Sequence, residues 1–160
     1  MKNPAPKPSD SKDKRDVFSA SKRSEIMSKV RSTGNKSTEL KLISVFKERG
    51  LTGWRRNSKL FGHPDFVFPK LKIAIFVDGC FWHGHDCRNT KPQDHHDYWA
   101  QKIARNRARD AAATEHLERL GYAVIRIWEC EFKRSNQDVL AKKLQIVASA
   151  RNEKQNEETE

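Results

Sequence analysis

Two apolar segments on either side of a long helical pattern most constrain the fold of this chain. LKIAIFV, at residues 71–77, is the most apolar run, and YAVIRIW follows at residues 122–128. Runs of this kind predict buried strands. Residues 97–120 predict a long helix that Gly121 ends, and apolar strands joined by a helical crossover readily lie side by side. We therefore expect the two segments to be neighbouring strands.

Weaker patterns predict the elements around this pair. Helices are expected at residues 22–31, 39–49 and 136–150, and strands at residues 54–56 and 64–68. This order predicts an α/β fold in which helices cover a mixed sheet. The chain has 160 residues, enough for one domain. We expect that domain at residues 21–150, between a disordered basic arm at 1–20 and a frayed polar tail at 151–160.

The charge of the chain favours a polyanionic partner. Lys and Arg number 32 and Asp and Glu 21, so the formal net charge is +11. Nucleic acid is the leading candidate, and a merely soluble basic protein is the alternative. No apolar run reaches the length of about 20 residues that spans a bilayer, and the N-terminus has no apolar signal region. We expect a cytoplasmic protein without a membrane partner.

A cluster of cysteine and histidine follows the first apolar segment. Cys80, His85 and Cys87 lie within eight residues, and Cys130 follows the second segment. Three cysteines and one histidine are a usual ligand set for a closed, structural zinc site. Buried free cysteines are the plainer interpretation, but the spacing favours a metal. His83 is the competing histidine ligand, and we prefer His85 because His83 has a catalytic use.

Polar residues at strand ends predict a second metal site. Asp65 begins one expected strand, and Asp78 ends the most apolar one. Carboxylate and backbone carbonyl oxygens there would suit Mg²⁺, which can polarise a phosphate. His83 could act as general base on a water. Turn chemistry at Asp65 and capping at Asp78 are the alternatives.

Aromatic and basic residues near these sites predict contacts with DNA. Phe81 and Trp82 lie in the loop that zinc would tether, and exposed rings there could wedge between base pairs. Burial in the core is the alternative, and for Trp99 the two interpretations are equally good. Lys102, Arg105 and Arg109 would share one helix face that suits phosphate contacts, although a solvated face would also explain them.

Four motifs together resemble the very-short-patch mismatch-repair endonucleases. They are Pro64-Asp65-Phe66-Val67, the segment from Phe76 to His85 that contains GCFWH, the segment from Tyr98 to Asp110, and Ile127-Trp128-Glu129-Cys130. The match covers roughly residues 20–135. It implies a restriction-endonuclease-like core related to the PD-(D/E)xK nucleases, and Mg-dependent nicking of one DNA strand on the 5′ side of the T in a T:G mispair.

The resemblance also implies roles for individual residues. Asp65 and the Val77 carbonyl correspond to magnesium ligands, and His83 to the residue that activates water. The zinc ligands correspond to Cys80, His85, Cys87 and Cys130. The intercalating aromatics correspond to Phe81, Trp82 and Trp99. Asp110 and Glu39 match acidic positions near the active site, where Asp110 would hold a histidine or a water. Asp78 replaces a second histidine of some members, as a metal ligand or an orienting residue, and the lysine of the wider nuclease pattern is missing.

Two other functions compete with mismatch nicking. A restriction-type nuclease would cut both strands of unmodified duplex, and a zinc-stabilised module would bind DNA without cutting it. The aromatic residues favour mismatch nicking, because unstacking is cheapest at a mispair. The expected substrate is double-stranded DNA with a T:G mispair, with mismatch-repair proteins and a DNA polymerase acting downstream. One active centre suffices to nick one strand, so we expect a monomer.

Overall fold

The computed structural model describes residues 38–87 and 96–157, all of which belong to one compact unit, residues 33–160. The expected basic arm and the expected helix at 22–31 lie outside the described residues. None of the helices in the described ranges is both long and apolar enough to cross a lipid bilayer.

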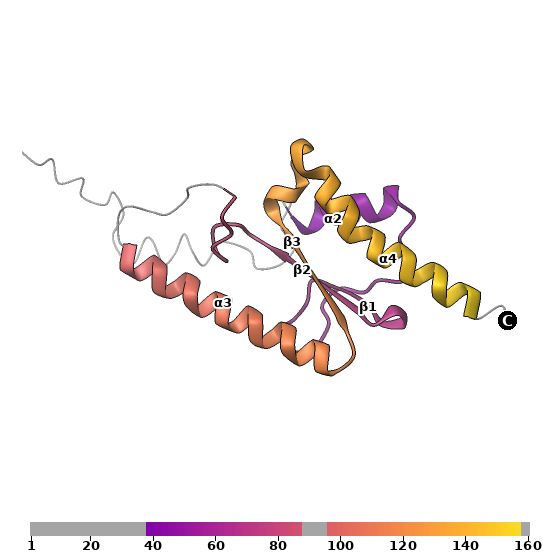
Figure 1. Ribbon diagram of the computed structural model, residues 1–160, viewed down its shortest axis with the longest axis horizontal. Helices are drawn as coiled ribbons and strands as arrows, with labels where there is room; N and C mark the ends of the chain where they lie inside the picture. The colour runs from indigo at the N-terminus through magenta and orange to yellow at the C-terminus, as the bar shows by residue number, and fades with distance from the viewer. Residues whose placement is uncertain (1–37, 88–95, 158–160) are drawn as a thin grey trace, which may run out of the picture. The chain divides into compact units, whose positions relative to one another are not determined.

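Three strands form one mixed sheet in the order β1–β2–β3, with β1 at Phe66–Phe68, β2 at Ile73–Asp78 and β3 at Ala123–Trp128. β1 is antiparallel to β2, with Phe66 opposite Ile75. β2 is parallel to β3, with Asp78 opposite Trp128. The two apolar segments are therefore neighbours, as their sequences predict (Figure 1).

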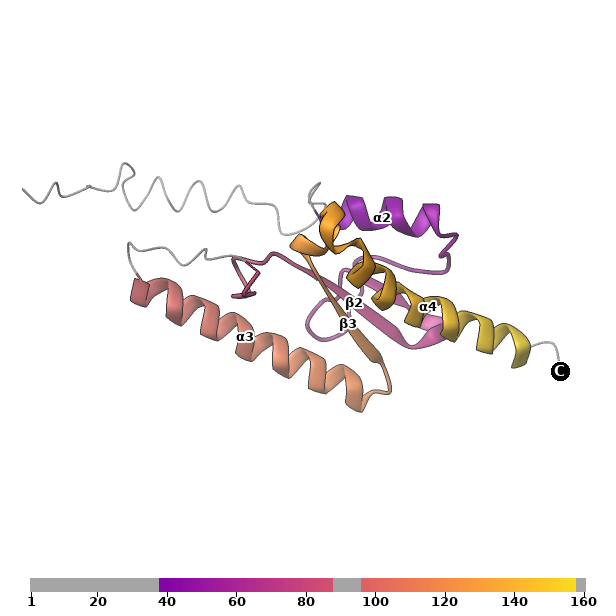
Figure 2. The same ribbon diagram turned by 45° about the horizontal axis from the view of Figure 1, so that its top comes forward.

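Helices cover both faces of this sheet (Figures 1 and 2). α3, His96–Arg119, makes the crossover from β2 to β3 and lies on one face. α2, Glu39–Glu48, and α4, Gln137–Glu157, lie on the other. Short 3-10 turns occupy Pro69–Leu71 (η1), Glu129–Phe132 (η2) and Arg134–Asn136 (η3). The prediction of a mixed sheet covered by helices is confirmed.

Alternation along the strands divides the core into two clusters. Ile73 and Ile75 pack with Ile125 and Ile127 against α2 and α4, whereas Phe76 faces α3. Because successive side chains of a strand point to opposite faces, Asp78 and Arg126 fall on the α3 face of the sheet. The larger cluster stabilises the sheet from behind, and the polar residues gather on the opposite face.

Several boundaries differ from the predictions, and β1 begins at Phe66 rather than at 64. Residues 54–56 form no strand but a single bridge between Arg55 and Val67, because the backbone turns left-handed at Asn57. β2 begins at Ile73 rather than at 71, because η1 and a left-handed Lys72 precede it.

The last helix also differs, because α4 continues to Glu157 instead of ending at residue 150. The first part of the expected frayed tail is therefore helical. Two side chains of this extension reach the main chain of other elements: Arg151 donates to the carbonyl of Gly50 at 2.7 Å, and Lys154 to that of Lys70 at 2.6 Å.

Candidate active site and metal centre

Asp65 lies directly before β1, at the end of a tight loop. Its Oδ2 accepts a hydrogen bond from the Val77 backbone N–H at 2.7 Å. Burial, and after it the nearby carboxylates of Glu39 and Asp78, raise the pKa of Asp65 to about 6 against the lowering effect of the Val77 hydrogen bond. A buried carboxyl group surrounded by two others is the environment that a divalent cation relieves.

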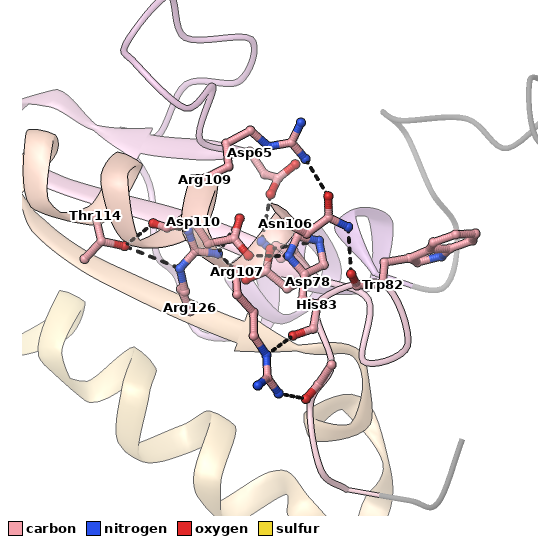
Figure 3. A network of polar contacts seen from close by, with 12 residues as sticks. Asp65, Asp78, Trp82, His83, Asn106, Arg107, Arg109, Asp110, Thr114 and Arg126 are labelled. Carbon is pink, nitrogen blue, oxygen red and sulfur yellow. Dashed lines mark hydrogen bonds and ion pairs between the residues drawn. The ribbon is translucent and has the colours of Figure 1, made fainter. Parts of the chain in front are cut away.

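His83 lies between two carboxylates from different elements (Figure 3). Its Nδ1 is 2.5 Å from Oδ2 of Asp110 on α3, and its Nε2 is 3.7 Å from Oδ1 of Asp78 at the end of β2. The His83 side chain is 20% exposed, so water can reach it. An imidazole whose Nδ1–H is held by a carboxylate presents an Nε2 lone pair that can accept a proton. The structure therefore brings Asp65, Asp78, His83 and Asp110 to one side of the sheet.

Glu39 lies behind Asp65 at the start of α2. It is buried, with 4% of its surface exposed, and forms an ion pair with Arg56. Its charge reaches Asp65 strongly enough to raise the pKa of that carboxyl. Glu39 is therefore near the candidate site, as the resemblance implies.

Cys80, His85, Cys87 and Cys130 form a compact cluster in which all the ligand atoms lie within 4.8 Å of one another. The sulfurs of a tetrahedral zinc site, with Zn–S near 2.3 Å, lie roughly 3.8 Å apart, so this set needs only a small contraction to hold the ion. Burial raises the pKa of Cys130 to about 12 and also raises that of Cys80, so both sulfurs stay protonated until a cation compensates their charge. The residues fit a structural zinc.

The structure also separates the two histidines as the sequence suggests. The His85 ring stacks on Trp128 at 4.4 Å and its Nδ1 lies 3.5 Å from the Cys130 sulfur. The backbone N–H of His85 donates to the Cys80 carbonyl at 2.8 Å, which closes the loop around the cluster. His83 points instead to the carboxylates.

The aromatic residues of the loop and of α3 pack on one another outside both core clusters. Phe81 lies 5.0 Å from Trp82 and 5.1 Å from Trp99, measured between ring centroids. All three are half-buried, and Tyr98 beside them is 52% exposed. The Lys102 ammonium lies 5.4 Å from the centre of the Trp82 ring. The rings are thus neither core residues nor freely projecting ones, and we call Phe81, Trp82 and Trp99 the aromatic cluster.

α3 holds the loop through two polar side chains. Asn106 donates to the Trp82 carbonyl at 2.7 Å, and Arg107 donates to the carbonyls of His83 and Gly84. Arg105 and Arg109 are exposed on the same helix, and Arg109 also donates to the Asn106 side chain at 3.1 Å. Lys102 is half-buried against the aromatic rings. Lys102 therefore lies next to the aromatic cluster, and Arg107 next to the His83 loop.

Sequence reasoning missed Arg126, which lies in the middle of β3 and contacts both Asp78 and Asp110. The available signal was an arginine inside an otherwise apolar strand. Arginine is seldom buried without a partner, so its position predicts an acidic neighbour from another element.

Comparisons with known proteins assign the family. The profile described as DNA mismatch endonuclease Vsr matches residues 15–89. A type II nicking enzyme of Neisseria meningitidis, V.NmeAIP, is 40% identical over 120 residues, which cover 74% of this chain and 84% of that enzyme. The chain belongs to the Vsr family. This assignment confirms the resemblance seen in the sequence motifs.

Further relatives of this Vsr-family chain bear related names. The DNA mismatch endonuclease Vsr of Escherichia coli is 34% identical over 119 residues, 74% of this chain and 76% of that protein. The type II nicking enzyme V.XorIIP of Xanthomonas oryzae is 39% identical over 117 residues, with coverage of 72% and 85%.

Proposed function

We propose that this Vsr-family chain is a DNA mismatch endonuclease that nicks one strand on the 5′ side of the T in a T:G mispair by Mg-dependent hydrolysis. The observation that carries the proposal is the meeting of Asp65, Asp78, Asp110 and His83 beside the loop that follows β2. Pure DNA binding needs no such group. The relatives named as mismatch endonucleases and nicking enzymes support the same activity.

His83 acts as the general base. Asp110 accepts a hydrogen bond from Nδ1–H and fixes the ring, so Nε2 is free to take a proton from the attacking water. As the ring becomes charged, Asp78 stabilises it from 3.7 Å. Asp65 and the Val77 carbonyl would hold magnesium, which when bound supplies a Lewis acid for the scissile phosphate.

Asp78 acts as an orienting residue rather than as a metal ligand. Its side chain is 8% exposed and its Oδ2 accepts a hydrogen bond from Arg126 at 2.6 Å. Its other oxygen faces His83, so both oxygens already face protein partners. Glu39 contributes charge near Asp65 while it remains paired with Arg56.

The remaining features prepare the DNA. Zinc on Cys80, His85, Cys87 and Cys130 would hold the loop to the end of β3. The aromatic cluster then acts as a wedge at the mispair, and Lys102, Arg105 and Arg109 contact backbone phosphates. The sheet and helices serve as a restriction-endonuclease-like core related to the PD-(D/E)xK nucleases. We place the enzyme in the cytoplasm as a monomer, with mismatch-repair proteins and a polymerase acting after the nick.

One assay separates the three candidate activities. Duplexes with T:G or C:G in the same context are labelled at the 5′ end of each strand and incubated with Mg²⁺ or without it. We expect one nick, in the T strand of the T:G duplex, that needs Mg²⁺. Cutting of both strands in both duplexes would instead identify a restriction-type nuclease, and retarded but intact DNA a binding module.

The same assay tests the metal-binding carboxylate. Asp65→Ala should abolish nicking, because Asp65 would bind the magnesium ion. The gel-shift affinity for the T:G duplex should persist, because the proposed phosphate contacts come from α3 and not from Asp65. Asp138→Ala, which removes an exposed acid on α4, is the matched control and should nick at the parental rate. Nicking by Asp65→Ala at the parental rate would refute the site.

A further inference from the structure

We propose that Arg126 is a positioning residue for the nicking reaction, because it holds the two carboxylates that flank His83. This inference rests on the proposed endonuclease function and adds a residue to its machinery. Arg126 lies on β3, Asp78 on β2 and Asp110 on α3, so a single guanidinium joins three elements at the site (Figure 3).

The two carboxylates share their oxygens between Arg126 and His83 in the same way. Oδ2 of Asp78 accepts from Arg126 Nη1 at 2.6 Å, and Oδ1 of Asp78 lies 3.7 Å from His83 Nε2. Oδ1 of Asp110 lies 3.6 Å from Arg126 Nη1, and Oδ2 of Asp110 lies 2.5 Å from His83 Nδ1. Each carboxylate therefore has one oxygen toward the guanidinium and one toward the imidazole.

Other contacts fix the guanidinium in this place. It lies over the Phe76 ring, with Cζ 4.5 Å from the ring centre, and Phe76 is opposite Arg126 in the parallel register. Nη2 donates to the Asp110 main-chain carbonyl at 3.1 Å, and Nε lies 3.5 Å from Thr114 Oγ1. A planar guanidinium held in this way keeps Nη1, the atom that faces both carboxylates, in a fixed place.

The charge arrangement requires such a group. Asp78 and Asp110 both face the same imidazole, and two carboxylates brought together without a cation repel each other. His83 carries no lasting positive charge if it must begin as a neutral base. Arg126 is the permanent cation that contacts both carboxylates. Without it the carboxylates are free to move apart, and the His83 ring loses the direction that Nε2 needs.

The test compares Arg126→Gln, Arg126→Lys and Lys143→Gln. Lys143 is a matched control, because it forms an ion pair with Glu131 and donates to the Arg126 carbonyl at 2.6 Å, yet contacts neither Asp78 nor Asp110. Measured quantities are the single-turnover nicking rate on T:G duplex with saturating Mg²⁺, the Kd for that duplex, and the Tm.

For Arg126→Gln we expect the rate to fall about 10- to 100-fold, less than the full effect of a general base, while Kd changes little. Arg126→Lys keeps the charge without the fork, so its rate should be intermediate. Lys143→Gln should lower the Tm with little change in rate. In an Asp78→Asn background, Arg126→Gln should cost clearly less than in the parental protein, because both changes disturb one arrangement.

The outcomes separate this inference from the proposed function. If the parental protein does not nick T:G duplex, the proposed function fails and the inference fails with it. If the parental protein nicks and Arg126→Gln nicks equally fast, only the inference fails. If the nicking rate falls in proportion to the Tm in both Lys143→Gln and Arg126→Gln, the effect of Arg126 on the rate is explained by stability alone, and Arg126 is a structural residue. Should Arg126→Gln not fold, a parental nicking rate in Arg126→Lys would overturn the inference that the Arg126 guanidinium positions Asp78 and Asp110.

Discussion

Asp65, the proposed magnesium ligand, is a residue whose buried charge lowers the stability of the fold. The carboxyl is buried beside Glu39 and Asp78, and its pKa rises to about 6 from an ordinary value of 3.8. Below pH 3.8 the group is protonated in both the folded and the unfolded chain. As the pH rises toward 6, the unfolded chain ionises first, so the folded state without magnesium loses relative stability.

This sign gives a prediction for Asp65→Asn. The amide keeps an oxygen that can accept from the Val77 N–H but carries no charge. In Mg-free buffer at pH 7.5 the variant should be more stable than the parental protein by about 3 kcal/mol, since the pKa rises from 3.8 to about 6 and one pKa unit corresponds to about 1.4 kcal/mol. Near pH 4 the advantage should largely disappear. Urea unfolding at both values measures it, with Asp138→Asn as the exposed control; an equal advantage at both values would contradict the prediction.

α3 is the element that assembles the site. It contributes Asp110 to His83, holds the loop through Asn106 and Arg107, and carries Trp99 of the aromatic cluster. Its inner face packs on the sheet through Ala113 and Leu117. The spacing between this helix and the loops on either side of it therefore decides whether the proposed catalytic groups meet.

Gly62 lies in the loop before Asp65, and a substitution there tests the spacing between that loop and α3. Its φ is +79°, and an added Cβ would lie 2.5 Å from the Ala113 Cβ on α3. Gly121 has a nearly equal φ of +77° with open space around it. Both alanine variants should pay for the left-handed backbone, by about 1–2 kcal/mol. Gly62→Ala should lose about 1–3 kcal/mol more from overpacking, and should also nick more slowly. Equal losses in urea unfolding would contradict this close contact.

The aromatic cluster gives a second prediction at this scale. Trp82→Ala should reduce the preference for T:G over C:G duplex about tenfold in Kd, within the roughly 1–3 kcal/mol that base–aromatic stacking provides. Its Tm should change little, because Trp82 belongs to neither core cluster. Phe61→Ala removes an exposed ring that lies against His116, outside the aromatic cluster, and should leave the preference intact. An undiminished preference in Trp82→Ala would remove this residue from the wedge.

At the scale of the whole molecule, the cysteine cluster joins segments that are far apart in the chain. Cys80, His85 and Cys87 follow β2, whereas Cys130 follows β3, and the parallel pairing of these strands brings both exits to one edge of the sheet. His83 lies inside the loop that the cluster closes, so zinc would secure the general base together with the fold.

Cys87→Ala tests this coupling. Cys87 is exposed, so its loss removes no core packing, and a fall in stability reports ligation. We expect the zinc content to drop below that of the parental protein. A loss of about 2 kcal/mol would lower the Tm by roughly 4–8 °C. Elemental analysis and thermal unfolding measure the two effects, with Asp86→Ala as the exposed neighbour in the same loop. An absence of zinc from the reduced parental protein would rule out the zinc proposal.

Patterns confined to short segments were enough to predict much of this protein. The periodicity of residues 71–77, 97–120 and 122–128 predicted two neighbouring strands and their helical crossover, because burial imposes those patterns locally. The spacing of Cys80, His85 and Cys87 predicted a metal cluster for a similar reason, since three ligands that lie close together in one loop can reach the same ion. The predicted end of α4 was wrong, because contacts to Gly50 and Lys70, which are distant in sequence, support the extension of the helix.

The residue types that build the site, and most of the elements that carry them, can be read from local sequence patterns. How the acids lie around His83 depends on tertiary packing: Asp110 contacts Nδ1, Asp78 faces Nε2, and Arg126 contacts both acids. The physical reason is that Asp78 and Arg126 are 48 residues apart and meet only because β2 and β3 pair in one register. A charge's effect depends on distances of a few ångströms, and packing across the sheet sets those distances.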